Sequence, residues 1–263
     1  MRVIRVTDHA EVSALAAELL AKFIAEHDEV VLALPTGGTP LGMYNELVTL
    51  ARTGALDLGR ATVFNLDEYV GLPSDHSQSY ASYMRRHLYD RAEFDPTKLH
   101  IPDGNAEDLV AACASYEGRI AEAGGLDIAV LGIGANGHIA FNEPGCGLNS
   151  RVRVVRLSDR TVLDNARFFD DPRAVPRHAI TMGVGTIRSS RALMMLASGE
   201  GKAAAVAAAL EGPVTTRCPA SAIQLHPSAV VILDEEAASA LRVRPWSKEE
   251  FLADPHAPQF LFL

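Results

Sequence analysis

The sequence predicts an α/β fold with a mostly parallel central sheet and helices on both of its faces. Short apolar runs, of the length of buried strands, alternate along the chain with stretches whose apolar residues recur at helical spacing. Such alternation is typical of parallel strands joined by helices that cover both faces of the sheet. The 263-residue chain shows no linker, charge run or repeat, so we expect a single domain over residues 1–263, with residues 242–263 only weakly assigned.

The first elements are the clearest. A helix is predicted at residues 12–24, where apolar residues recur at helical spacing and Thr7 or Asp8 precedes them as a cap. A buried strand follows at residues 30–34, and a second helix at residues 41–51. This strand–loop–helix unit sets the pattern that the rest of the chain repeats.

The remaining elements continue the alternation. Strands are predicted at residues 61–66, 126–132, 192–197 and 229–233, and residues 151–157 are expected to be extended. Helices are predicted at residues 80–89, 106–123 and 202–210. In open α/β sheets, ligands bind at the carboxyl ends of the strands. The residues just after each strand are therefore the candidates for a functional site.

Composition and charge exclude several classes of function. The mixture of 48% hydrophobic and 22% charged residues is that of a globular protein. The net charge of −9 argues against a nucleic-acid partner, although a few local cations can still bind a small anion. The start shows no targeting segment, and the longest apolar run, residues 203–210, is far short of the roughly 18 residues of a membrane span. Three cysteines, Cys113, Cys146 and Cys218, are too few for a disulfide framework, so we expect a cytoplasmic protein with no membrane partner.

A glycine-rich turn follows the strand at residues 30–34. Gly37 and Gly38 let backbone N–H groups converge, Thr39 can cap the next helix, and Pro40 suits its first turn. Free N–H groups at a helix N-terminus favour a phosphate. A plain tight turn would show the same pattern, and the spacing of a nucleotide P-loop is absent.

Two carboxylates, Asp67 and Glu68, stand where the strand at residues 61–66 ends. Adjacent residues of a strand point to opposite faces, so we expect only one of them to enter the site. That carboxylate could act as a general base if burial raises its pKa. A helix-capping or ion-paired acid is the alternative.

The strand at residues 126–132 opens into a loop that carries His138. Gly132, Gly134 and Gly137 match GxGxxG, but Pro144 interrupts before a full helix can form, so we reject a dinucleotide site. The loop can fold Glu143 back to the His138 imidazole and orient it. The spacing of the two residues does not fit a helical zinc site, and a structural histidine is the alternative.

Two cations could bind an anion at this edge. Lys202 opens a predicted helix just after a strand, where its charge opposes the helix dipole, and a bound anion would relieve this conflict. Arg167 is the second candidate, although a solvated arginine would look the same. The surrounding segment, residues 151–177, is a candidate for a lid.

Taken together, these stretches resemble the glucosamine-6-phosphate deaminase (isomerase) family over residues 1 to about 240. The most specific blocks are FNLDEYVGL at residues 64–72 and GANGHIAFNEP at residues 134–144; the others lie at residues 34–40, 166–169, 183–186 and 224–227. The resemblance implies a modified Rossmann-like, three-layer fold. It also implies conversion of D-glucosamine 6-phosphate and water to D-fructose 6-phosphate and ammonia in amino-sugar catabolism, with no metal or organic cofactor. It leaves open a monomer or a homo-oligomer.

The resemblance also assigns roles to individual residues. Asp67 matches the base that moves a proton between C2 and C1, His138 the group that opens the pyranose ring, and Glu143 the carboxylate that supports this histidine. The phosphate-binding positions of the family correspond to Gly37, Gly38, Thr39, Arg167 and Lys202.

Asn136, two residues before His138, departs from members that carry aspartate there. It adds no negative charge, so we expect His138 to be less strongly driven to the imidazolium form than in those members. A second departure concerns activated members, which bind an N-acetylated sugar phosphate through serines after the Glu-Pro pair and a basic pair further on. Here the stretch is Cys146-Gly147-Leu148, and only Arg153 keeps a suitable charge. We expect weak or absent activation by N-acetylglucosamine 6-phosphate.

Three alternatives stay open on the sequence. A galactosamine-6-phosphate deaminase would use the same catalytic set, because only the C4 epimer differs. A lactonase acting on a phosphorylated sugar acid would need activated water but no proton transfer at C2. A catalytically inactive sugar-phosphate sensor is disfavoured because Asp67, His138 and Glu143 occur together.

Overall fold

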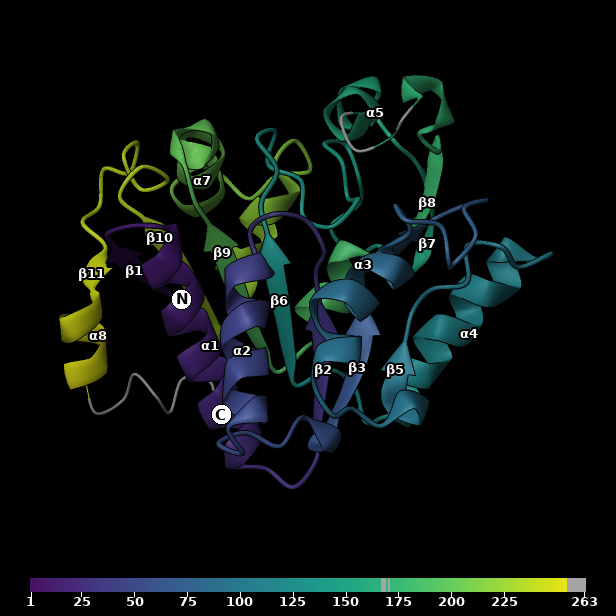
Figure 1. The fold of residues 1–263 in the computed structure, drawn as a ribbon. Helices are drawn as coiled ribbons and strands as arrows, with labels where there is room; N and C mark the ends of the chain where they lie inside the picture. The colour runs from purple at the N-terminus through teal and green to yellow at the C-terminus, as the bar shows by residue number, and fades with distance from the viewer. Residues whose placement is uncertain (167–168, 170, 255–263) are drawn as a thin grey trace.

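A parallel eight-stranded sheet forms the centre of the molecule in the computed structural model, which describes residues 1–166, 169 and 171–254 (Figure 1). Every pair of neighbouring strands in it is parallel. Its strands, in spatial order, are β11 (Trp246–Ser247), β1 (Arg2–Val6), β10 (Ala229–Asp234), β9 (Ala192–Ala197), β6 (Ile128–Gly132), β2 (Val30–Leu34), β3 (Ala61–Asn65) and β5 (Leu99–His100). The predicted α/β class with a mostly parallel sheet is confirmed.

Helices cover both faces of this sheet, as predicted. The helices, in chain order, are α1 (His9–Ala25), α2 (Leu41–Arg52), α3 (Tyr80–His87), α4 (Leu109–Glu122), α5 (Asp159–Ala166), α6 (Val184–Arg188), α7 (Ala203–Leu210) and α8 (Lys248–Ala253). In β2, Val30, Leu32 and Leu34 pack in one core cluster with α1, α2 and α3, whereas Ala33 faces the opposite cluster with α4, α6 and α7. The strands are apolar on both faces because both faces are buried.

A second, antiparallel sheet stands beyond the carboxyl edge of the first. It consists of β4 (Asp67–Tyr69), β8 (His178–Thr181) and β7 (Arg153–Arg156), in the order β4-β8-β7. Figure 1 shows α5 above the second sheet, near the top of the view. The expected extended stretch at residues 151–157 contains β7, but the sheet itself is not evident from local sequence. The second sheet places β4 beside the carboxyl edge of the central sheet.

Most element boundaries agree with the prediction to within three residues, and the differences have local causes. The helix expected from residue 106 begins at Leu109 because the Asp108 carboxylate accepts hydrogen bonds from the first backbone N–H groups. The prediction that Thr39 caps the second helix is wrong: Pro40 occupies the N-cap position, and no side chain caps this end.

The end of the chain forms more structure than its weak periodicity predicts. β11 pairs with β1, and Ser247 begins α8 with a capping box to Glu250. Phe251 of α8 joins the core cluster. No helix among the described residues has the length and apolar character needed to cross a membrane. The assignment of residues 1–263 to one domain stays a prediction.

Candidate active site

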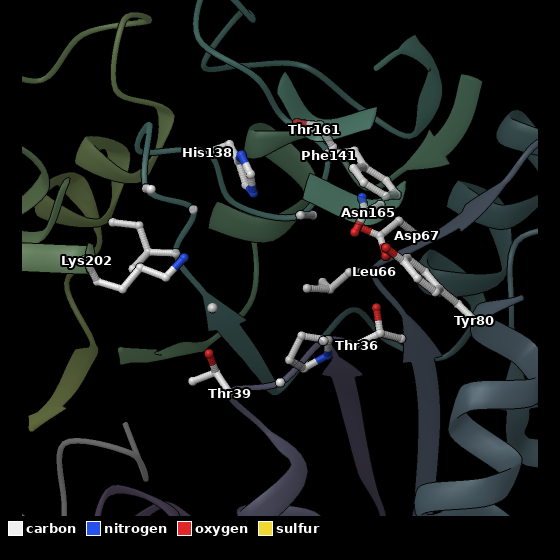
Figure 2. Close-up of a pocket in the computed structure, with 18 of the residues that line it drawn as sticks. Thr36, Thr39, Leu66, Asp67, Tyr80, His138, Phe141, Thr161, Asn165 and Lys202 are labelled. Carbon is white, nitrogen blue, oxygen red and sulfur yellow. The ribbon is translucent and has the colours of Figure 1, made fainter. Parts of the chain in front are cut away.

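A cavity of about 560 Å³ opens at the carboxyl edge of the central sheet, next to β4 of the second sheet. Figure 2 shows the residues of its walls. Lys202 and Thr39 lie on one side, Asp67 and Tyr80 lie on the other, and the His138 ring lies between them. The lining residues are Pro35, Thr36, Gly37, Gly38, Thr39, Leu66, Asp67, Tyr80, Gly132, Ile133, Gly134, Ala135, His138, Ala140, Phe141, Thr161, Leu163, Asn165 and Lys202.

The glycine-rich turn after β2 forms the floor of this cavity. Gly37 has a φ of +95°, a left-handed conformation that residues with a Cβ atom rarely adopt. Two tyrosine hydroxyls fix the turn from behind: Tyr44 of α2 donates to the Pro35 carbonyl, and Tyr83 of α3 donates to the Gly37 carbonyl. Thr39 does not cap α2, and its side chain lies in the cavity wall.

Lys202 reaches the same cavity from the turn between β9 and α7. It ends a short 3₁₀ turn, Glu200–Lys202, that follows Gly199 at a φ of +89°. Figure 2 shows the Lys202 amino group pointing into the cavity above Thr39. An anion held between this cation and the free N–H groups of the glycine turn would be bound from two sides. Arg167, the other predicted cation, lies outside the described residues.

Asp67 and Glu68 point to opposite sides of β4, as predicted. Asp67 lines the cavity and is 5% exposed. Glu68 turns toward α3, where its carboxylate accepts hydrogen bonds from the backbone N–H groups of Tyr80 (2.9 Å) and Ala81 (2.8 Å). The helix-capping alternative therefore describes Glu68, and Asp67 is left as the acid of the site.

The surroundings of Asp67 favour its protonated form. The pKa of the Asp67 carboxyl is raised to about 8, mainly by burial and further by the negative charge of Glu68, while a hydrogen bond from the Phe141 backbone N–H opposes the shift. Tyr80 and Phe141 stack with ring centroids 5.8 Å apart and form an apolar wall beside it. A carboxyl with a pKa in this range can both take up and release a proton near neutral pH.

The loop that carries His138 has a glycine where the backbone passes close to the imidazole, and its glycines do not form a nucleotide site. The Gly134 N–H donates to the His138 carbonyl at 2.9 Å. A Cβ atom on Gly134 would lie 2.4 Å from the imidazole ring, so a larger residue there would displace the imidazole from this position. Gly137 has a φ of +83°. No helix follows this loop; the next element is β7, in agreement with our rejection of the GxGxxG interpretation.

Glu143 folds back toward His138, as the sequence predicts. Its Oε2 atom lies 3.8 Å from His138 Nδ1, a distance of an ion pair. Asn136 links the two residues: its Oδ1 accepts a hydrogen bond from the His138 backbone N–H at 3.1 Å, and its Nδ2 donates to Glu143 Oε2 at 2.8 Å. Asn136 and Glu143 do not line the cavity; they support the imidazole from behind.

Several cavity residues were not singled out by their sequence. Tyr80 begins α3, and its hydroxyl hydrogen-bonds both Thr36 and Tyr69, while burial raises the pKa of the Tyr80 phenol. Thr161 and Asn165 reach the cavity from α5, inside the segment predicted as a lid. Only the three-dimensional packing of α3 and α5 brings these side chains to the site.

The arrangement supports acid–base chemistry on a small phosphorylated molecule. One side of the cavity offers a cation and backbone donors, the opposite side offers a carboxyl of raised pKa, and an imidazole backed by a carboxylate lies between them. Among the described residues, no group of three or more His, Cys, Asp or Glu side chains is arranged to hold a metal ion.

Comparisons with known proteins identify the relatives of this chain. The model of a family described as glucosamine-6-phosphate isomerases/6-phosphogluconolactonase matches residues 8–232. A glucosamine-6-phosphate deaminase from Streptomyces avermitilis is 46% identical over 256 residues, which cover 97% of this chain and 98% of the relative. Another, from Rhodopirellula baltica, is 50% identical over 239 residues, which cover 91% and 95%.

Solved structures give the same picture. The structure of a monomeric glucosamine-6-phosphate deaminase of the NagB superfamily is 44% identical and superimposes with a TM-score of 0.89, covering 91% of this chain and 100% of the other. The 6-phosphogluconolactonase of Trypanosoma cruzi is 22% identical with a TM-score of 0.72, covering 92% and 97%, and shares the fold.

Proposed function

The chain belongs to the family of glucosamine-6-phosphate isomerases and 6-phosphogluconolactonases, and we propose that it converts D-glucosamine 6-phosphate and water to D-fructose 6-phosphate and ammonia. One observation carries this proposal: the Asp67 carboxyl and the His138 imidazole, which Glu143 supports from behind, face a single cavity that is also lined by Lys202 and the glycine turn. Relatives that are 45–50% identical over nearly the full chain bear the name of this activity.

The anion site would orient the sugar. Gly37, Gly38, Thr39 and Lys202 would hold the 6-phosphate, and Arg167 is proposed as a further contact. Because the phosphate is remote from the reacting carbons, its binding energy is available to position them. A sugar anchored in this way would lie with its ring between His138 and Asp67, which line the same cavity.

His138 would open the pyranose ring by transferring a proton between the ring oxygen and the C1 hydroxyl. Glu143 and Asn136 would hold the imidazole in place for this step. Ring opening produces an aldehyde at C1, which acidifies the C2–H bond. This step therefore prepares the substrate for the carboxylate on the opposite wall.

Asp67 would then remove the C2 proton and return it to C1. The product of the first transfer is a cis-enolamine and that of the second a ketimine, which water hydrolyses to the ketose and ammonia. Asp67 must be ionised to act as the base, and the substrate's ammonium group would lower its pKa on binding. General acid–base steps of this kind contribute about 10²–10⁴-fold each.

A coupled ammonia assay on D-glucosamine 6-phosphate tests the proposal. We expect release by the purified protein, near-complete loss in Asp67→Asn, and retention in Asp57→Asn, which alters an exposed carboxylate that caps a short 3₁₀ turn and does not line the cavity. No ammonia from the unaltered protein, or full activity in Asp67→Asn, would refute the proposal.

Two alternatives are separated by the choice of substrate. D-galactosamine 6-phosphate, assayed in parallel, distinguishes the epimers. A phosphosugar lactonase, whose name the family description also contains, needs no proton transfer at C2, so hydrogen exchange at C2 in D₂O excludes it. We favour the glucosamine substrate because relatives that are 46–50% identical carry that name.

We also propose a cytoplasmic enzyme whose partner is the sugar phosphate and neither nucleic acid nor membrane. Cys113, Cys146 and Cys218 are all free thiols, which suits a reducing compartment. The net charge of −9 disfavours a nucleic-acid partner. The proposal fits a monomer or a homo-oligomer, and one structural relative is described as monomeric.

A further inference from the structure

The carboxylate behind His138 is attached to a helix that forms part of the cavity wall. Glu143 Oε2 accepts the hydrogen bond from Asn136, which lies in the same loop. Glu143 Oε1 accepts two further hydrogen bonds, from the hydroxyl of Ser158 at 3.1 Å and from the hydroxyl of Thr161. Ser158 precedes α5, and Thr161 lies in its first turn. The orientation of Glu143 is thus set from two directions.

Ser158 also serves as the start of α5. Its Oγ atom accepts the Thr161 backbone N–H at 3.1 Å and lies 3.0 Å from the Thr161 hydroxyl oxygen. The first turn of the helix and the Glu143 carboxylate are therefore held by one set of hydrogen bonds. Further along the same helix, Leu163 and Asn165 line the cavity. A change in the position of α5 would move the cavity wall and the Glu143 anchor together.

We propose that Ser158 and Thr161 are positioning residues for the ring-opening step, because their hydroxyls fix Glu143 at the distance from which it holds the His138 imidazole. The inference rests on the proposed function, in which His138 opens the sugar ring. Glu143 has three side-chain torsions, and the hydrogen bond from Asn136 constrains only one of its two oxygens. The two hydroxyls constrain the other oxygen.

A purely structural role accounts for only part of this arrangement. A serine cap needs its own Oγ and a backbone N–H, and both are present without Glu143. The cap bond uses the backbone N–H of Thr161 and not its hydroxyl, yet this hydroxyl is directed to the same carboxylate oxygen as Ser158. Hydrogen bonds to a charged group are the stronger kind, so this pair is suited to fixing a carboxylate.

The test separates ring opening from binding. Thr161→Val keeps the side-chain shape and removes the donor, so we expect kcat on the cyclic D-glucosamine 6-phosphate to fall about tenfold, as the loss of one charge-assisted hydrogen bond predicts. The open-chain alditol 2-amino-2-deoxy-D-glucitol 6-phosphate needs no ring opening, and we expect its Kd to be unchanged within about twofold. Thr161→Ser restores the hydroxyl and should restore most of the activity.

Two further variants complete the design. Ser158→Ala removes the other donor, and we expect a decrease in kcat of about threefold, smaller because the Thr161 bond remains. It also serves as the test if Thr161→Val does not fold. Asp159→Asn is the matched control: this residue lies in the same turn, is largely exposed and pairs with Arg177, so its activity should stay at the wild-type level.

The outcomes are distinct. Full activity of both Thr161→Val and Ser158→Ala overturns the inference, and so does a loss in Thr161→Val that Thr161→Ser does not rescue. An alditol Kd that weakens as much as kcat falls assigns Thr161 a structural role only. Absence of ammonia release by the unaltered protein refutes the proposed function itself, and this inference with it.

Discussion

At the scale of single residues, the acid–base chemistry depends on the different surroundings of two neighbouring carboxylates, Asp67 and Glu68. Glu68 accepts three backbone N–H groups, which partly compensate its burial, whereas Asp67 has one such donor and faces the cavity. The alternation of side chains along a strand predicts that only one of them enters the site, and this is confirmed. The sequence could not predict the degree of burial, because Tyr80 and Phe141, which enclose Asp67, come from distant elements.

The raised pKa of Asp67 predicts a cost in stability that grows with pH. The unfolded carboxyl ionises near its ordinary value of 3.8, but the folded one stays protonated up to about pH 8. Between these values the unfolded state loses a proton that the folded state keeps, so the free energy of unfolding declines as pH rises. Asp67→Asn removes the ionisation and should stabilise the fold by on the order of a few kcal/mol at pH 8 and little at pH 4.

Urea unfolding of the wild-type protein and Asp67→Asn at both pH values measures this difference. Equal free energies of unfolding of the two proteins at pH 8 would contradict the predicted cost of ionising the buried Asp67 carboxyl. Asp57→Asn, at an exposed carboxylate, is the control and should show no such pH-dependent gain.

Asn136 allows a second prediction at this scale. Its Nδ2 donates to Glu143 at 2.8 Å, so Asn136→Asp would place two carboxylates in contact beside His138. Like charges at this distance share a proton, and the added negative charge favours the imidazolium. We expect the alkaline limb of the pH–rate profile to move to higher pH. Unmoved limbs would count against the assigned role of this residue.

At the scale of secondary-structure elements, the site is formed by short loops at one edge of the central sheet. Local periodicity was sufficient to predict strands such as β9 and helices such as α1, because each buries a regular apolar face. It was insufficient for β4, β8 and α5. β4 is three residues long and pairs Asp67 with Thr181, a contact far apart in sequence, and α5 is a short helix of polar character. Thr161 and Asn165 were missed for this reason.

The turn that carries Lys202 depends on an acid from the next strand. Asp234, at the end of β10, is 5% exposed and accepts hydrogen bonds from the Ser198 hydroxyl and from the backbone N–H groups of Gly199 and Ala237. Asp234→Asn keeps the shape but loses the charge and one acceptor oxygen. We expect KM for the sugar phosphate to rise about tenfold while kcat changes little, because the phosphate anchor shifts and the acid–base groups do not.

Steady-state kinetics of Asp234→Asn beside Glu235→Gln, an exposed neighbour, measures this effect. A fall in kcat with KM unchanged would show that Asp234 does not act through the Lys202 turn.

At the scale of the whole molecule, the sequence predicted the fold class and the edge of the central sheet at which the site lies. The order of the strands was not predictable, because β1 inserts between the two C-terminal strands β11 and β10 by pairing across almost the whole chain. The long blocks around Asp67 and His138 identified the family, whereas Gly37, Gly38 and Lys202 alone would have fitted many anion sites. Packing then decided which residues meet.

Regulation provides a prediction at this largest scale. Arg153, the one suitable charge in the stretch where activated members bind their effector, is half-buried and hydrogen-bonds Cys146. We therefore expect N-acetylglucosamine 6-phosphate to leave the dependence of rate on substrate concentration unchanged. A change from a sigmoidal to a hyperbolic curve on its addition would show that an effector site is present.

The proton transfer by Asp67 is tested most directly by following the reaction in D₂O by NMR, for the wild-type protein and Asp67→Asn. We predict that the wild-type protein forms fructose 6-phosphate with solvent deuterium entering at C1 on one face only, and that Asp67→Asn forms this product at least about 10²-fold more slowly. Product formed at the wild-type rate by Asp67→Asn, or deuterium on both faces of C1, would contradict it.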